Sequence, residues 1–126
     1  MAKGKILVAD DDNNIAELLR LYLEKEGYQV LKAYDGLEAL ELAVEKPVQL
    51  ILMDVMMPVM DGLEATKAIR ELEREDAKKI PIIAMTANAF EEDRKACLDA
   101  GMDEHIGKPI DIPLLKSAII KMLAKS

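Results

Sequence analysis

Short apolar runs alternate along the chain with longer stretches in which apolar residues recur every three or four positions. The runs predict strands, because residues that are apolar on both faces are typical of strands covered on both sides. Five such strands are predicted, at residues 6–9, 28–33, 50–53, 80–85 and 104–106. The second run is the least apolar of the five, so we expect it to lie near an edge of the sheet.

An amphipathic segment follows each run and predicts five helices. In the first, apolar residues at 15, 18, 19, 22 and 23 have the spacing of one helix face. The others are predicted near 37–44, 63–72, 91–100 and 115–123, and the charged run 71–79 is expected to be the solvated end of the third. Gly27 and Gly101 follow two of these segments and are expected to end them.

Strands and helices that alternate five times predict an α/β fold with a parallel sheet and right-handed crossovers. The chain of 126 residues suits a (βα)5 doubly wound five-stranded parallel sheet and is too short for an eight-stranded barrel. Nothing in the sequence resembles a linker or a repeat. We therefore expect a single domain over residues 1–126.

Charge and composition exclude several classes of partner. Lys and Arg number 17 against 24 Asp and Glu, a net charge of −7, which argues against nucleic acid and against an anionic membrane surface. No apolar run approaches the roughly 20 residues of a membrane span, and the first residues lack the apolar core of a signal peptide. The single Cys97 excludes an internal disulfide and fits a reducing compartment. The sequence therefore predicts a cytoplasmic protein.

Polar residues gather where the predicted strands end. Open α/β sheets bind ligands at the carboxyl ends of their strands. The residues there are Asp10, Asp11 and Asp12 after the first strand, Asp54 at the third, Thr86 at the fourth and Lys108 after the fifth. Neighbouring carboxylates repel each other, and a hard cation such as Mg²⁺ relieves that repulsion. A metal, an ammonium group and a hydroxyl around one carboxylate suit in-line phosphoryl transfer, with Asp54 as nucleophile. Asp12 is expected to cap the first helix instead.

Four segments together resemble the receiver domain of response regulators. They are residues 6–12, 52–62, 81–87 and 107–109, and the resemblance covers essentially the whole chain. It implies a flavodoxin-like sheet of strand order 2-1-3-4-5 and a phosphoprotein of two-component signalling. It also implies a protein that catalyses only its own phosphorylation and dephosphorylation, and so no enzyme in the usual sense.

The resemblance assigns a role to each site residue. Asp54 would accept a phosphoryl group from a histidine kinase or a histidine phosphotransfer protein. Thr86 and Lys108 would bind that group, and the Lys108–Pro109 peptide bond would be cis. The ligands implied for Mg²⁺ are Asp10, Asp11, Asp54 and the backbone carbonyl of Met56.

The resemblance also implies a switch. Phosphorylation would move Thr86 inward and reshape the face formed by the fourth helix, the fifth strand and the fifth helix, which would bind a downstream protein. A phosphorylation-dependent homodimer through this face is a hypothesis. The chain departs from the family at His105, a switch position that is commonly Tyr or Phe. Met56 and Asn88 occupy positions that tune hydrolysis of the acyl phosphate, and Met56, unable to bind an attacking water, predicts slow hydrolysis.

Two other functions stay open at this point. One is a Mg²⁺-dependent phosphohydrolase with an Asp nucleophile, although such enzymes usually carry a second acid where this chain has Met56. The other is a binding scaffold that works without phosphorylation, although the set of acids, Thr86 and Lys108 is intact. Turnover of small phosphate esters would favour the first, and absence of Mg²⁺ affinity would favour the second.

Overall fold

The computed structural model describes residues 4–87 and 91–125 and contains one five-stranded parallel sheet. The strands are β1 (Lys5–Ala9), β2 (Gln29–Ala33), β3 (Leu50–Asp54), β4 (Ile82–Thr86) and β5 (Glu104–Gly107). Their order in the sheet is β2-β1-β3-β4-β5, and all four pairings are parallel. The predicted fold class and strand order are therefore confirmed, with β2 at an edge and β3 in the centre.

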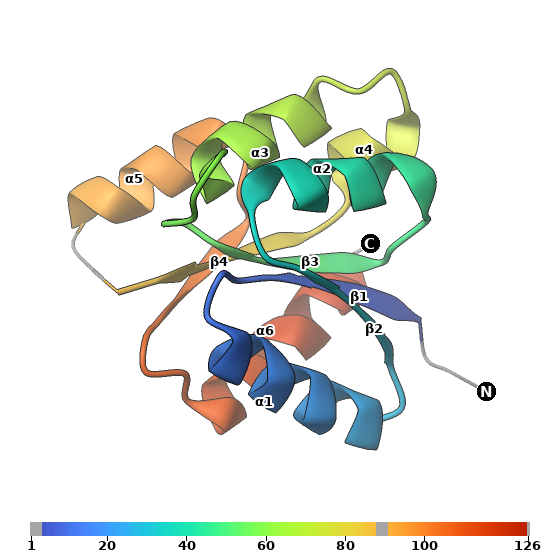
Figure 1. The fold of residues 1–126 in the computed structure, drawn as a ribbon, viewed down its shortest axis with the longest axis vertical. Helices are drawn as coiled ribbons and strands as arrows, with labels where there is room; N and C mark the ends of the chain where they lie inside the picture. Colours follow the sequence, from blue (N-terminus) through green and yellow to red (C-terminus); the bar gives the residue numbers. More distant parts are fainter. Residues whose placement is uncertain (1–3, 88–90, 126) are drawn as a thin grey trace.

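Helices cover both faces of this sheet (Figure 1). They are α1 (Asn13–Lys25), α2 (Gly36–Glu45), α3 (Gly62–Arg70), α4 (Glu75–Lys79), α5 (Glu91–Ala100) and α6 (Ile112–Lys125). On one face, α2 to α5 pack mainly through small residues such as Ala39, Ala43 and Ala65, so their backbones approach the sheet closely. On the other face, α1 and α6 pack through large residues such as Leu19 and Ile119.

The charged run 71–79 differs from its prediction as the end of the third helix. The helix α3 ends at Arg70, and residues 75–79 form the separate helix α4, in which Ala77 is buried. Between them, the guanidinium of Arg74 donates to the carbonyls of Ala43 and Val44, at 2.9 and 2.8 Å. These carbonyls end α2, where no further helical amide is available to them. A contact between residues so far apart in sequence leaves no local pattern.

Smaller differences concern element ends. The strand β4 begins at Ile82 rather than at residue 80, and Pro81, which lacks an amide hydrogen, precedes it. Gly27 and Gly101 follow α1 and α5 with φ of 100° and 109°, the left-handed backbone that glycine adopts at helix ends, as predicted. Over the part of the chain that the structure describes, no helix has both the length and the apolar character that crossing a bilayer requires.

Candidate metal and phosphoryl site

Three carboxyl groups meet at the carboxyl ends of the central strands. Asp10 follows β1 and is fully buried, and Asp54 ends β3 with 4% of its surface exposed. Asp11, the next residue after Asp10, is exposed. One oxygen from each of the three lies within 4.8 Å of the others. We call these three residues the acid cluster, and the structure brings them together as the sequence predicts.

Lys108 reaches into the acid cluster from the segment after β5. Its Nζ atom lies 3.0 Å from Asp54 Oδ2, to which it donates a hydrogen bond. The same atom lies 3.0 Å from Asp10 Oδ2, but that oxygen is buried without a hydrogen bond, so this second contact is a charge pairing of poor alignment. A buried carboxylate oxygen without a donor is unusual in proteins. It is the kind of group that a cation satisfies.

Burial alters the proton affinity of these groups. Burial, opposed by the Lys108 hydrogen bond and reinforced by the charge of Asp10, raises the pKa of Asp54 to about 6. For Lys108, burial alone would lower the pKa, but its close contacts with the Asp10 and Asp54 carboxylates outweigh it and raise the pKa above its usual value. The Lys108 ammonium group therefore stays charged at neutral pH. Burial disfavours the charged form of the Asp54 carboxyl group.

The residues present fit a hard divalent cation. The acid cluster offers only oxygen ligands, which Mg²⁺ prefers, and it faces a single ammonium group. The Oδ2 atom of Asp10, which has an ion pair with Lys108 but no hydrogen bond, offers a ligand atom inside the cluster. These residues would hold a magnesium ion, and the backbone of Met56 lies beside them because its amide donates to Asp54 Oδ1 at 3.2 Å.

Asp12, the third of the acids that follow β1, has a structural role. The Asp12 carboxylate accepts hydrogen bonds from the amides of Asn14 and Ile15, at 2.9 and 3.4 Å, and so caps α1. The amide of Asp12 donates to Asp10 Oδ1 at 2.9 Å. Asp12 is therefore a cap, as predicted, and it also orients the buried acid through its backbone.

Glycine brings the start of α3 against the acid cluster, which sequence reasoning did not foresee. A Cβ atom at Gly62 would lie 2.2 Å from the carbonyl oxygen of Asp54, so no other residue fits there without a shift. The amide of Gly62 donates to the carbonyl of Val55 at 3.0 Å. The dipeptide Asp61–Gly62 predicts only a turn, and nothing in it indicates contact with the buried strand end.

The remaining predicted residues that the structure describes lie on β4 and β5 or directly after β5. Thr86 ends β4 and is 5% exposed, and its carbonyl accepts from the amide of Lys108 at 2.8 Å. The peptide bond between Lys108 and Pro109 is cis, as predicted. His105 lies partly buried on β5, and its Nδ1 atom is 3.8 Å from Glu104 Oε1. Asn88 lies outside the described residues.

Two hollows lie beside His105, and Lys121 of α6 lines both of them. Their volumes are about 560 and 200 Å³. The first extends along β5 and α6 to Lys108 and Pro109. The second is closed on its other side by α5, through Cys97 and Leu98.

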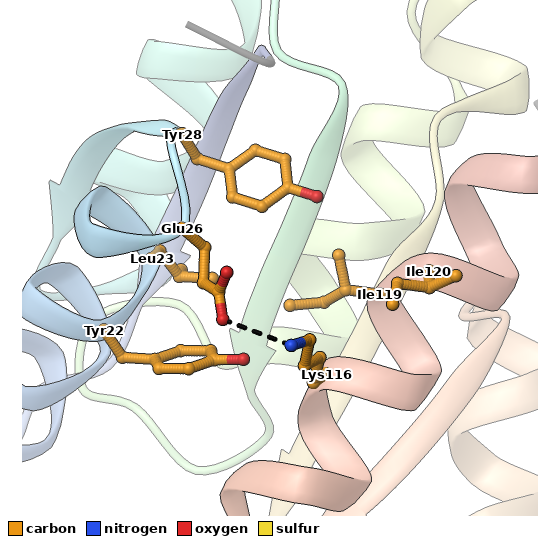
Figure 2. A pocket seen from close by; sticks show the side chains of 7 residues that line it. All are labelled: Tyr22, Leu23, Glu26, Tyr28, Lys116, Ile119 and Ile120. Carbon is orange, nitrogen blue, oxygen red and sulfur yellow. Dashed lines mark ion pairs between the residues drawn. The ribbon is translucent and has the colours of Figure 1, made fainter.

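A third hollow lies between α1 and α6, where Glu26 and Lys116 form an ion pair of 3.5 Å (Figure 2). Its volume is about 40 Å³, room for no more than a few water molecules and far below the several hundred Å³ of a ligand site. The ring of Tyr22 borders it, and burial raises the pKa of the Tyr22 hydroxyl.

Comparisons with known proteins identify the relatives of this chain. Residues 6–120 match the family described as response regulator receiver domain. The chain is 39% identical over 130 residues to the hybrid signal transduction histidine kinase I of Dictyostelium discoideum. It is 40% identical over 106 residues to the transcriptional regulatory protein SrrA of Staphylococcus aureus. These matches cover 99% and 84% of this chain.

The curated relatives are much longer, because the chain spans only 8% of the first and 42% of the second. Among solved structures, a receiver domain of a sensor histidine kinase from Pseudomonas aeruginosa matches with a TM-score of 0.88 and 35% identity. That match covers 98% of this chain and 99% of the other. The solved structure is described as having a magnesium ion coordinated in its active site cleft.

Proposed function

Because the chain belongs to the response regulator receiver domain family of two-component systems, we propose that Asp54 is its phosphoacceptor. One observation carries this proposal. The carboxylate of Asp54 ends the central strand, is buried, and has the Lys108 ammonium 3.0 Å away within a cluster of three acids. Such a site combines a nucleophile, a fixed positive charge and a set of metal ligands.

In the proposed reaction, an Asp54 oxygen attacks the phosphorus of a phosphohistidine. A phosphorus–oxygen bond forms and the phosphorus–nitrogen bond breaks, with its electron pair leaving on the imidazole. Lys108 then neutralises charge on the new acyl phosphate, and the Thr86 hydroxyl donates to one of its oxygens. The acid cluster and the Met56 carbonyl would hold a magnesium ion, which would further neutralise charge on the phosphoryl oxygens.

The surface around the acid cluster suits a protein donor. Met56 and Val59 lie in the loop after β3 and are 74% and 78% exposed, the two most exposed large apolar side chains among the described residues. A histidine kinase or a phosphotransfer protein would bury them while it presents its phosphohistidine. This role for the two side chains is part of the proposal.

For the output we propose the face formed by α5, β5 and α6, which are the fourth predicted helix, the fifth strand and the fifth predicted helix. Thr86 would draw this face inward after phosphorylation, with His105 as the side chain that repacks between the two hollows. A downstream protein, or a second copy of the chain, would bind the reshaped face. An unchanged sedimentation profile on addition of a phosphoryl mimic would contradict the homodimer.

We also propose that residues 1–126 act as one receiver domain with no substrate besides its own acyl phosphate. Both apolar cores pack on the same sheet, which supports one cooperative unit. Multiple turnover of a small phosphate ester such as p-nitrophenyl phosphate would contradict this part of the proposal.

The decisive experiment incubates the protein with acetyl phosphate, with and without Mg²⁺, and measures intact mass. We expect a gain of one phosphoryl group that requires Mg²⁺ and is lost in Asp54→Asn. The matched control is Asp61→Asn, which makes the same change at the cap of α3 and should leave uptake intact. Equal uptake by Asp54→Asn, or none by the unaltered protein, would overturn the assignment of Asp54.

A further inference from the structure

Three backbone hydrogen bonds anchor the loop that joins β3 to α3, which we call the β3–α3 loop (residues 55–61), and a fourth, from the amide of Met60 to the carbonyl of Pro58 at 2.7 Å, lies within it. At its start, the amide of Val55 donates to the carbonyl of Met85 on β4, at 3.0 Å. At its end, the amide of Gly62 donates back to Val55, also at 3.0 Å. The third bond comes from a separate helix, because the amide of Gly36, at the start of α2, donates to the carbonyl of Met60 at 2.8 Å.

The β3–α3 loop contains a strained residue beside that third bond. Val59 has a φ of 68°, and it is the only non-glycine residue with a positive φ among the described residues. A β-branched side chain in this conformation costs on the order of 1–3 kcal/mol, so contacts elsewhere must hold it. Its own side chain is 78% exposed and supplies little packing. The bond from the Met60 amide to the Pro58 carbonyl spans Val59, and the bond from Gly36 to Met60 holds the peptide unit that follows it.

Space, rather than conformation, requires glycine at position 36. Its φ lies outside the left-handed range, and it occupies the first turn of a regular helix, where alanine is ordinarily preferred. A Cβ atom there would lie 2.0 Å from the Met60 carbonyl oxygen and 2.6 Å from its carbon. Since Cβ contacts below 3.0 Å essentially never occur, any side chain would push this carbonyl away by about 1 Å.

The same loop carries the backbone that meets the acid cluster, through the bond from the Met56 amide to Asp54. We propose that Gly36 is a positioning residue for this site: its bare backbone lets α2 hold the Met60 carbonyl and so keeps the β3–α3 loop in its metal-binding shape. The inference rests on the proposed function, because it concerns magnesium at the same acids. Gly36 itself touches neither the acids nor the phosphoryl group.

The first test compares two variants that exchange the same residue types at opposite ends of α2. Gly36→Ala adds a methyl group against Met60, whereas Ala43→Gly removes a buried one far from the loop. We expect Gly36→Ala to weaken Mg²⁺ binding about 10- to 100-fold by titration calorimetry, the usual effect of losing support for metal ligands. Ala43→Gly should lower the stability of the metal-free protein while its Mg²⁺ affinity stays within about twofold of the original.

A second test needs no variant and so does not depend on how Gly36→Ala folds. If the Gly36 bond favours the metal-binding loop, then bound Mg²⁺ must strengthen that bond, because coupling between two sites is reciprocal. Hydrogen exchange should therefore slow at the Gly36 amide when Mg²⁺ is added. The internal control is the Lys46 amide, which donates to Leu42 at the other end of α2 and should change less.

Several results would overturn the inference. One is Mg²⁺ affinity of Gly36→Ala equal to that of the original protein. Another is equal loss of affinity in Ala43→Gly, which would indicate a general effect of helix stability. Equal slowing of hydrogen exchange at the Gly36 and Lys46 amides would also overturn it, because it would indicate that Mg²⁺ stabilises the whole of α2. Failure of the proposed function is separable, since it would appear as absent Mg²⁺ binding or absent phosphorylation in the unaltered protein.

Discussion

Two connections bring oxygen atoms to the acid cluster, and they are built in opposite ways. The turn after β1 (residues 10–12) closes on its own side chains, since Asp12 caps α1 and donates its amide to Asp10. The β3–α3 loop contains a left-handed Val59, and besides bonds from its own amides it accepts bonds from two amides outside it, those of Gly62 and Gly36. Substitution of an acid should therefore disturb the turn most, whereas substitution of Gly36 or Gly62 should disturb the loop most.

The largest effect should come from a buried acid of the turn. We expect Asp10→Asn to weaken Mg²⁺ binding about 100-fold, because it removes a charged ligand from a fully buried position. Titration calorimetry measures this. The control is Asp12→Asn, which makes the same change two residues later and keeps the cap, and which should alter affinity by no more than about twofold. Equal losses would mean that general acidity, rather than position, sets the affinity.

The raised pKa of Asp54 should make the stability of the metal-free protein depend on pH. A carboxyl group whose pKa rises on folding stabilises the fold most at low pH, and that contribution is lost as pH rises from about 4 towards 6. Asp54→Asn removes the effect. Its advantage in unfolding free energy should therefore grow by about 1–3 kcal/mol between pH 4 and pH 7, measured by urea denaturation in EDTA. A constant difference across this range would contradict the burial of an isolated charge.

The exposed side chain of Met56 should control the lifetime of the acyl phosphate. The backbone amide of this residue bonds to Asp54, whereas its side chain is exposed. The side chain can therefore be replaced without loss of a buried contact. An amide there would orient a water molecule, so Met56→Asn should shorten the phosphoryl half-life by about tenfold. Release of inorganic phosphate from the phosphorylated protein measures it. A half-life that stays the same or lengthens would exclude this role.

Loss of the cap of α1 should have a smaller effect and leave metal binding alone. Asp12→Ala removes the acceptor for two helix amides and should lower the unfolding free energy by about 1 kcal/mol. Thermal and urea denaturation both report it. A simultaneous loss of Mg²⁺ affinity would show that the turn after β1 does not support Asp10 through its backbone alone.

The smallest effect should have the opposite sign and occur in the other connection. Val59→Gly replaces a strained β-branched residue by one that adopts a positive φ freely, against a greater entropy of the unfolded chain. We expect a net gain of roughly 0.5 kcal/mol in unfolding free energy. Loss of stability would mean that the Val59 side chain, although exposed, makes contacts that outweigh the strain.

The sequence predicts the parts of the site that depend on strand ends. Asp54, Thr86 and Lys108 could be assigned because carboxyl ends of parallel strands meet at one edge, and alternation of strands and helices is visible along the chain. Asp12 could be assigned as a helix cap because capping is a local property that the neighbouring sequence reveals.

The parts that escaped prediction all depend on contacts between distant segments. The close approach of Gly36 to Met60 requires the packing of α2 against α3, which no local pattern encodes. The separate helix α4 is similar, because its start is defined by the contact of Arg74 with the end of α2. A run of charged residues gives no sign of the Arg74 contact, because the same residues are also typical of an exposed helix.

The order of strands in the sheet has a consequence for when signalling can begin. Asp10 follows the first strand, but its partner Lys108 follows the last one, and β3 and β4 lie between these two strands in the sheet. During synthesis on the ribosome, the chain must emerge as far as Lys108 before this charge pair can form. Until then, a nascent or truncated copy holds the acids without their ammonium group.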